Sequence, residues 1–271
     1  FVPKSNYDKS LFEAAAEGNT WAEKLQNLMS DLNVASQKGL VERFDSTIGA
    51  GTVLMPYGGK YQLTPQQNMV AKLPTIHKET NTATVMAYGY NPRISKENPY
   101  LGAVYAVVDS VTKAVCAGAD YRDVYLTFQE YFERLGTDPA RWGKPLAALL
   151  GGYLAQEKLG IAAIGGKDSM SGSFNDIDVP PTLTSFAVAP LSAKRVTSGE
   201  FKIGGNLVFW LKPKYDENRM PDFDSLKTLY DMMYMMLSDT KVKLIRSAWA
   251  VGYGGVMEAV CKMGFGNKIG F

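Results

Sequence analysis

The stretch that decides the fold is Ile161-Ala162-Ala163-Ile164-Gly165-Gly166-Lys167-Asp168-Ser169-Met170-Ser171-Gly172. Its apolar first four residues predict a strand, and glycines, a cation, an acid and hydroxyl groups follow directly. Glycine lets backbone amides approach a ligand closely, lysine supplies a positive charge, and a carboxylate can hold a metal ion that bridges phosphate oxygens. This composition predicts a turn that binds a phosphorylated substrate. An ordinary turn at a strand end is the alternative, because Gly, Asp and Ser are common in turns.

Other classes of site are disfavoured. The stretch has neither the Gly-Lys-Ser/Thr ending of a Walker loop nor the spacing of a dinucleotide fingerprint. His77 is the only histidine, which excludes a histidine metal cluster and disfavours hydrolases that rely on a histidine base. Cys116 and Cys261 lie in apolar helix-like runs, so we expect buried thiols rather than a disulfide or a zinc site.

The composition is that of an ordinary globular protein. The chain has 271 residues, of which 46% are hydrophobic and 21% charged, with a net charge of +2. This length predicts one large or two smaller domains, and the small net charge gives no indication of a nucleic-acid or membrane partner. No apolar run reaches the roughly 18 residues of a membrane span and no signal peptide is visible, so we expect a cytoplasmic location. Because the chain opens on Phe1, we expect it to be a fragment.

Apolar periodicity predicts the elements around the opening stretch. Helices are expected as a pair between residues 8 and 34, and at 98–118, 144–159, 224–237 and 254–261. Strands are expected at 52–55, 82–88, 124–127, 161–164, 182–189 and 206–211. In the helix at 144–159, the residues expected to point inward are Leu146, Leu149, Leu150, Tyr153 and Leu154. The composition turns polar after Ser192, which predicts a domain boundary there.

Further candidate ligand groups lie near the strand ends. Gln129 and Glu130 follow the strand at 124–127, and loops at the carboxyl ends of strands gather ligands in open α/β sheets. Glu130 is alternatively a solvated acid at a helix start. The segment 44–52 suits either a phosphate or a turn, and the acids Asp176 and Asp178 suit either a cation or an Asx-rich surface loop.

Five motifs together resemble the synthetase half of phosphoribosylformylglycinamidine synthase. The resemblance runs from about Leu40 to Pro190 and rests on residues 44–56, 126–135, 142–145, 165–174 and 179–183. It implies a ligase of purine biosynthesis, which uses ATP to activate formylglycinamide ribonucleotide and glutamine-derived ammonia to form the amidine.

The resemblance also implies the architecture. The expected fold class is α/β (α+β): a first-type domain with a four-stranded, mainly antiparallel sheet, followed by an αβ-sandwich domain. The chain resembles the second of two tandem copies, with a helical lead-in at 1–39, the first-type domain at 40–191 and a truncated sandwich domain at 192–271. The first-type domains of the two copies pair across a pseudo-dyad, so the implied partners are the first synthetase half and the glutaminase domain. A homodimer of the fragment is an alternative.

By resemblance, the residues that bind nucleotide or substrate are Gly165, Gly166, Lys167, Ser169, Gln129 and Glu130. ATP or ADP and magnesium are the implied cofactors, with Asp168 and Asp109 as the expected magnesium contacts, and no catalytic residue is assigned. An isolated fragment is expected to be inactive. The alternatives are a non-catalytic scaffolding half of the same enzyme and another synthetase-like or kinase-like member of the superfamily.

Two departures from the family pattern concern the metal. Where relatives carry His-Asp-x-Ser-Asp-Gly-Gly, this chain has residues 249–255 without a carboxylate. Where relatives have Glu and Asn four residues apart on the interface helix, this chain has Asp109 and Lys113. We therefore hypothesise that the lysine replaces a cation at the auxiliary nucleotide site.

Overall fold

A computed structural model of the chain describes residues 17–239 and 242–271. Its centre is a six-stranded sheet in the order β1-β4-β5-β10-β6-β7. These strands are β1 (Thr52–Leu54), β4 (Met69–Lys72), β5 (Thr82–Gly89), β6 (Tyr125–Tyr131), β7 (Ala162–Lys167) and β10 (Thr182–Ser192). Every neighbouring pair is antiparallel except β6 and β7, which are parallel. The expected mainly antiparallel α/β fold is confirmed, although the sheet has six strands rather than four.

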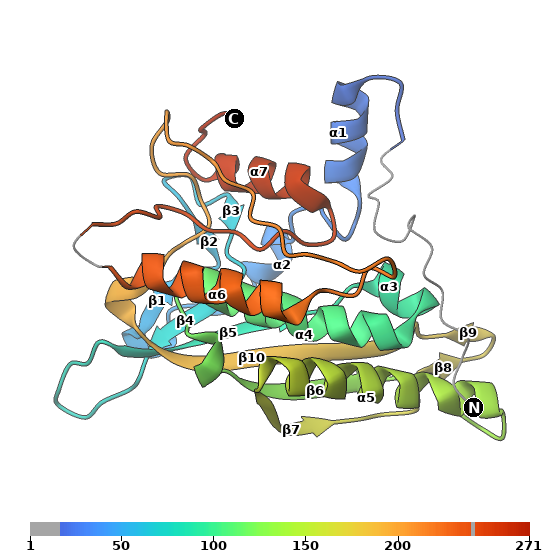
Figure 1. Cartoon of the computed structure of the whole chain (residues 1–271). Helices are drawn as coiled ribbons and strands as arrows, with labels where there is room; N and C mark the ends of the chain where they lie inside the picture. Colours follow the sequence, from blue (N-terminus) through green and yellow to red (C-terminus); the bar gives the residue numbers. More distant parts are fainter. Residues whose placement is uncertain (1–16, 240–241) are drawn as a thin grey trace.

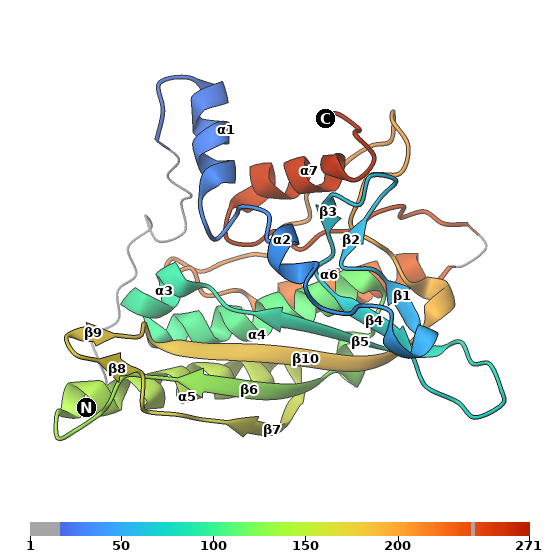
Figure 2. The ribbon, with the colours of Figure 1, turned by 180° about the vertical axis from the view of Figure 1, so that it is seen from behind.

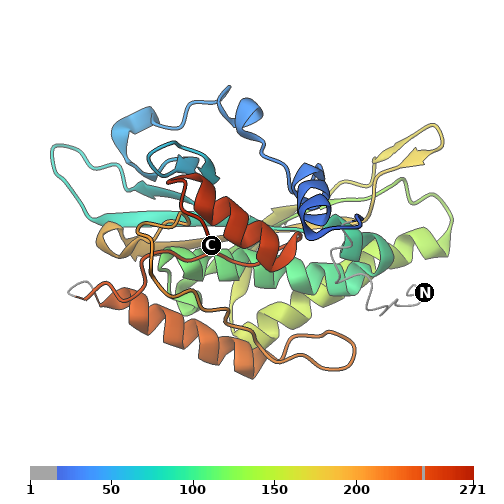
Figure 3. The same cartoon turned by 90° about the horizontal axis from the view of Figure 1, so that it is seen from above.

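Two small antiparallel ladders flank this sheet, β2 (Tyr57–Gly58) with β3 (Thr64–Pro65) and β8 (Ser173–Phe174) with β9 (Ile177–Asp178). The α-helices are α1 (Trp21–Ser30), α2 (Lys38–Val41), α3 (Pro92–Glu97), α4 (Pro99–Ala117), α5 (Pro139–Leu159), α6 (Phe223–Ser238) and α7 (Gly255–Phe265). Short 3-10 turns are η2 (Ile48–Ala50), η3 (Tyr121–Asp123) and η4 (Ala193–Arg195). Helices α4 and α5 cover one face of the sheet with α6 outside α4 (Figures 1 and 3), and from behind the strands stand in front of these helices (Figure 2).

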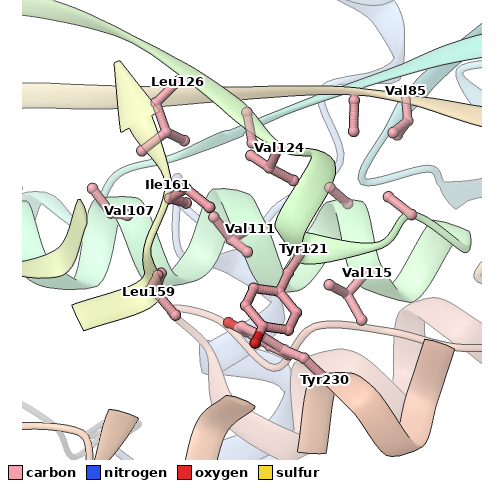
Figure 4. Packing of buried hydrophobic residues seen from close by; sticks show 14 of the residues in the cluster. Val85, Val107, Val111, Val115, Tyr121, Val124, Leu126, Leu159, Ile161 and Tyr230 are labelled. Carbon is pink, nitrogen blue, oxygen red and sulfur yellow. The ribbon is translucent and has the colours of Figure 1, made fainter. Parts of the chain in front are cut away.

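Helix α4 forms the centre of the core. It starts where Asn98 accepts a hydrogen bond from the backbone N–H of Leu101 at 3.0 Å, and it stops at Gly118, whose φ of 112° suits glycine. Its valine stripe packs with β6, β7 and Tyr230 of α6 (Figure 4). The helix is long and apolar enough to cross a membrane, but 67% of its most apolar window is buried inside the fold, as expected of a core helix.

Helix α5 differs from its prediction in both start and orientation. It begins at Pro139, after the cap residue Asp138, instead of at Lys144. The predicted inward positions Leu146, Leu149, Leu150 and Tyr153 are 45–64% exposed, and only Leu154 packs against the core. Small residues face inward instead, because a Cβ on Gly151 would lie 2.0 Å from the carbonyl oxygen of Tyr100 at the start of α4. The two helix backbones approach too closely for leucine between them.

The described ends of the chain differ from their predictions in part. The first of the two helices expected at 8–34 falls mostly outside the described residues, whereas α1 is capped by a reciprocal pair of hydrogen bonds between Thr20 and Glu23. The strand predicted at 206–211 is wrong: the segment is irregular, and its apolar side chains are 41–82% exposed. Helix α6 packs on α4 and contributes Phe223, Leu226 and Tyr230 to the main core.

Candidate functional site

The parallel pair β6 and β7 brings the two predicted ligand segments together. Gln129 pairs with Lys167, and Phe128 pairs with Gly166. The register shifts between Leu126 and Thr127, so Ile164 is the extra residue of a β-bulge and is 68% exposed. The predicted turn directly after Ile164 is therefore wrong, because pairing with β6 keeps Gly165, Gly166 and Lys167 in an extended edge strand.

The two glycines of β7 have different roles. A Cβ on Gly166 would lie 2.8 Å from the carbonyl oxygen of Phe128, so a side chain there would crowd the neighbouring strand. A Cβ on Gly165 would meet nothing within 4 Å. Gly165, Gly166 and Lys167 are exposed, and they leave the end of β7 open to solvent.

Strand β7 ends at Lys167, and the two residues after it stay beside β6. The backbone N–H of Ser169 donates to the carbonyl oxygen of Glu130 at 3.1 Å, and the N–H of Phe132 donates to the carbonyl of Ser169 at 2.9 Å. The hydroxyl groups of Ser169 and Ser171 lie 2.8 Å apart. These contacts fix the Ser169 hydroxyl beside the last residues of β6.

Glu130 lies inside β6 and not in a loop beyond it. Its side chain is 6% exposed, and its Oε1 atom has no hydrogen-bond partner. Burial, followed by the nearby Asp168 carboxylate, raises the pKa of Glu130 to about 7. Glu130 is therefore not the solvated helix-start acid of the alternative interpretation, and it can gain or lose a proton near neutral pH. Gln129 is half-buried, and its Nε2 donates to the carbonyl of Glu130 at 3.2 Å.

Sequence reasoning missed Glu133, a second buried carboxylate just past β6. Its side chain is 1% exposed, Oε2 has no hydrogen-bond partner, and Oε1 lies 2.5 Å from Nζ of Lys144 in α5. Nearby, Arg141 forms an ion pair with Asp178 at 2.6 Å, so Asp178 has an internal cation partner. The sequence signals were the motif at 126–135, which contains Glu133, and the motif at 142–145, which contains Lys144, but neither motif indicates that the two residues pair.

Asp109 and Lys113 lie on α4, on a different element from the β6–β7 strand ends. Nζ of Lys113 is 2.7 Å from Oδ2 of Asp109, and it also donates to the carbonyl oxygen of Tyr88 at 2.8 Å. Burial raises the pKa of Asp109, while the Lys113 ammonium opposes this. Lys113 is therefore the cation that pairs with the Asp109 carboxylate.

The residues fit magnesium unequally. Among residues 17–239 and 242–271, no three His, Cys, Asp or Glu side chains are grouped to hold a metal ion. Magnesium in phosphoryl-transfer sites usually takes one or two carboxylates together with substrate phosphates, which suits the exposed Asp168. Asp109 does not fit, because Lys113 already neutralises it.

Comparison with known proteins gives no matching family model but several curated relatives. The phosphoribosylformylglycinamidine synthase subunit PurL of Thermoplasma acidophilum is 22% identical over 91% of this chain and 34% of its own length. The PurL subunits of Pyrobaculum aerophilum and Thermus thermophilus are 24% and 23% identical over 90% and 92% of this chain. The chain spans about a third of the length of these relatives.

Solved structures of Thermotoga maritima PurL share the fold. PurL complexed with ADP aligns with a TM-score of 0.55 at 15% identity, over 78% of this chain and 32% of that one. PurL complexed with ATP and PurL complexed with FGAR each align with a TM-score of 0.53 at 16% identity, over 76% of this chain and 30% of theirs. The resemblance read from the motifs is therefore confirmed: over most of its length, the chain is similar in sequence and fold to about a third of phosphoribosylformylglycinamidine synthase subunit PurL.

Proposed function

We propose that this chain forms part of an ATP-dependent ligase that converts formylglycinamide ribonucleotide, ATP and glutamine-derived ammonia into formylglycinamidine ribonucleotide. The observation that carries the proposal is the parallel pairing of β6 with β7, which brings Gln129 and Glu130 beside Lys167 and Ser169. The similarity to PurL supports it, because PurL has been solved with ATP and with FGAR.

The chemistry of phosphoryl transfer suits these residue types. Such reactions depend on positioning and on stabilisation of charge at the phosphoryl oxygens. In this proposal Lys167 and the glycine amides stabilise that charge, Ser169 donates a hydrogen bond to the ribonucleotide phosphate, and Asp168 contacts magnesium. Magnesium, when bound, would neutralise the phosphates. Asp109 is left out of the metal set, because Lys113 serves as its cation.

The uncovered sheet face supports a scaffolding role as a second candidate function. Along β4, β5 and β6, four exposed apolar residues alternate with buried ones and so point away from α4 and α5. They are Met69, Met86, Tyr125 and Tyr131, each 39–53% exposed. Apolar side chains in such a row favour a protein partner. In the proposed assembly the first synthetase half covers this face and the glutaminase domain supplies ammonia, whereas the isolated chain pairs with a second copy.

The proposal also covers the domain division, the location and the activity of the chain by itself. Residues 40–191 form the first-type domain and residues 192–271 begin the sandwich domain, in a cytoplasmic enzyme. Because the composite site needs both halves, the chain alone is inactive, and amidine formation by the chain alone would contradict this.

Substitutions in the full-length enzyme separate the two candidates. The variants Lys167→Ala and Ser169→Ala are compared with Lys158→Ala, which removes an exposed cation from the end of α5. A ligase role predicts at least a tenfold loss of kcat/KM in the first two variants, with the assembly and the control unchanged. If both variants keep wild-type turnover while assembly weakens, the scaffold is supported and the ligase site is refuted.

A further inference from the structure

A cavity of about 290 Å³ lies at the opposite end of the sheet from the proposed ligase site. It is lined by η4 and the residues after it, by the end of α6, and by the returning segment 243–246. Because β10 runs antiparallel to β6, residues after Ser192 emerge where β6 and β7 begin, while Lys167 and Ser169 lie where they end. Figure 1 shows this separation: β8 and β9 lie at one end of the sheet, and the chain leaving β10 lies at the other.

The lining is strongly cationic. Five basic side chains, Lys194, Arg195, Lys202, Lys243 and Arg246, face one carboxylate, that of Asp239. The whole chain has 29 basic and 27 acidic residues, so this local excess of four exceeds the net charge of the entire molecule. Such a concentration of one sign in a concave surface raises the local concentration of anions.

The fold itself accounts for only some of these cations. Lys202 is paired with Glu200, and Arg195 donates to the hydroxyl of Tyr234 at 3.1 Å. Within the described part of the chain, Lys194, Lys243 and Arg246 form no ion pair with a carboxylate within 4.0 Å. Three positive groups therefore remain to bind a ligand.

The carboxyl end of α6 supplies a competing explanation for the charge. A helix end there carries about half a negative charge and attracts cations within one turn. The helix end and the Asp239 carboxylate together supply about one and a half negative charges. They therefore balance fewer than two of the five positive charges, and the helix end does not account for the others.

The remaining lining sets the kind of anion. Thr197 adds a hydroxyl group to the lining, whereas Ser198 donates its hydroxyl to Glu200 at 3.0 Å. Apolar atoms come from Val196 and Ile245. Hydroxyl, ammonium and guanidinium groups together suit the oxygens of a phosphoryl group, and arginine binds them bidentately. The volume is near the lower end for small-ligand sites, so it fits one or two phosphoryl groups and a small organic part.

We propose that this cavity is a second ligand site, which binds the phosphoryl group of a small organic phosphate through Lys194, Lys243 and Arg246. The site is independent of the ligase proposal, because it uses other residues at the other end of the sheet. A hollow of about 290 Å³ favours a small molecule over a polynucleotide.

Calorimetric titration with pyrophosphate tests the proposal. The wild-type chain is expected to bind in a saturable manner, more weakly at 200 mM than at 50 mM salt. The double variant Lys243→Ala/Arg246→Ala should bind at least tenfold more weakly, and Lys194→Ala alone at least threefold. These positions lie on irregular or 3-10 backbone and Lys243 and Arg246 are exposed, so the variants should keep the circular dichroism spectrum and melting temperature of the wild type.

Two controls decide what a loss of binding means. Lys78→Ala/Lys96→Ala removes the same charge from exposed positions that do not line the cavity. It should bind within twofold of the wild type. An equal loss in the Lys78/Lys96 control would reduce the effect to overall charge and overturn the site. If Lys167→Ala removes all saturable binding while Lys243→Ala/Arg246→Ala keeps it, the binding belongs to the end of β7 and the proposal is overturned. The absence of saturable binding to the wild type would also refute the proposal.

Discussion

Replacing Glu130 with glutamine is expected to remove a pH-dependent penalty on folding. The ordinary pKa of glutamate is 4.5, and in the folded chain burial and Asp168 raise the pKa of Glu130 to about 7. The folded state therefore holds this proton more tightly than the unfolded state. Stability from this group is fully present below pH 4.5, falls as the pH rises towards about 7, and is constant above that.

The size of the effect follows from the same two pKa values. One pKa unit corresponds to about 1.4 kcal/mol, so the interval from 4.5 to about 7 gives about 3 kcal/mol. Because Asp168 is exposed and its field is screened by solvent, we expect about 2 kcal/mol. Glutamine cannot ionise, so Glu130→Gln should lose less stability than the wild type between pH 5 and pH 8, by about this amount.

Urea unfolding at pH 5, 6, 7 and 8 measures this difference. The matched control is Glu157→Gln, which changes an exposed carboxyl group on α5 and should follow the wild type within about 0.5 kcal/mol at every pH. If Glu130→Gln shows the same slope of unfolding free energy against pH as the wild type, the pKa of Glu130 is not raised. Glu130 would then not gain or lose a proton near neutral pH, and the reasoning would be refuted.

Three further predictions concern the helices. Gly151→Ala should destabilise the fold by about 1–3 kcal/mol through its clash with the start of α4, whereas Gly204→Ala, where a Cβ meets nothing within 4 Å, should change it by less than about 0.5 kcal/mol in urea unfolding. Lys113→Ala should destabilise the fold by about 2–3 kcal/mol, because it leaves Asp109 without its partner. In a double-mutant cycle, the loss in Lys113→Ala/Asp109→Asn should be smaller than the sum of the losses in the two single variants. Burial raises the pKa of the Cys116 thiol to about 12, so at pH 8 a thiol reagent should label Cys116 only after unfolding, as mass spectrometry can show.

Elements with strong local signals were predictable from sequence. Helix α4 shows this best, because Asn98 and Pro99 define its start, Gly118 allows its left-handed stop, and the valine spacing marks its buried side. Each of these signals depends on neighbouring residues alone. The strand β5 was likewise confirmed from its own pattern at 82–88.

Features that depend on a second element were not predictable. The inward face of α5 is set by how closely α4 approaches at Gly151, and leucine spacing carries no information about that distance. The bulge at Ile164 depends on its register with β6, so a strand followed by glycines was read as a strand followed by a turn. At the candidate site, the residue types at 165–169 and 129–130 could be named, but the burial of Glu130 and the role of Glu133 appear only once α5 covers the end of β6.

The irregular segment at 206–211 has a practical consequence for handling the protein. Within the described part of the chain, no backbone hydrogen bond joins these residues to another segment, although Val208, Phe209 and Trp210 are strong strand formers. Backbone amides that are not paired with another strand, on an exposed apolar run, are a template for intermolecular cross-β aggregation. In concentrated solution this segment should nucleate insoluble aggregates, and a lysine introduced at Phe209 should improve solubility without disturbing the core.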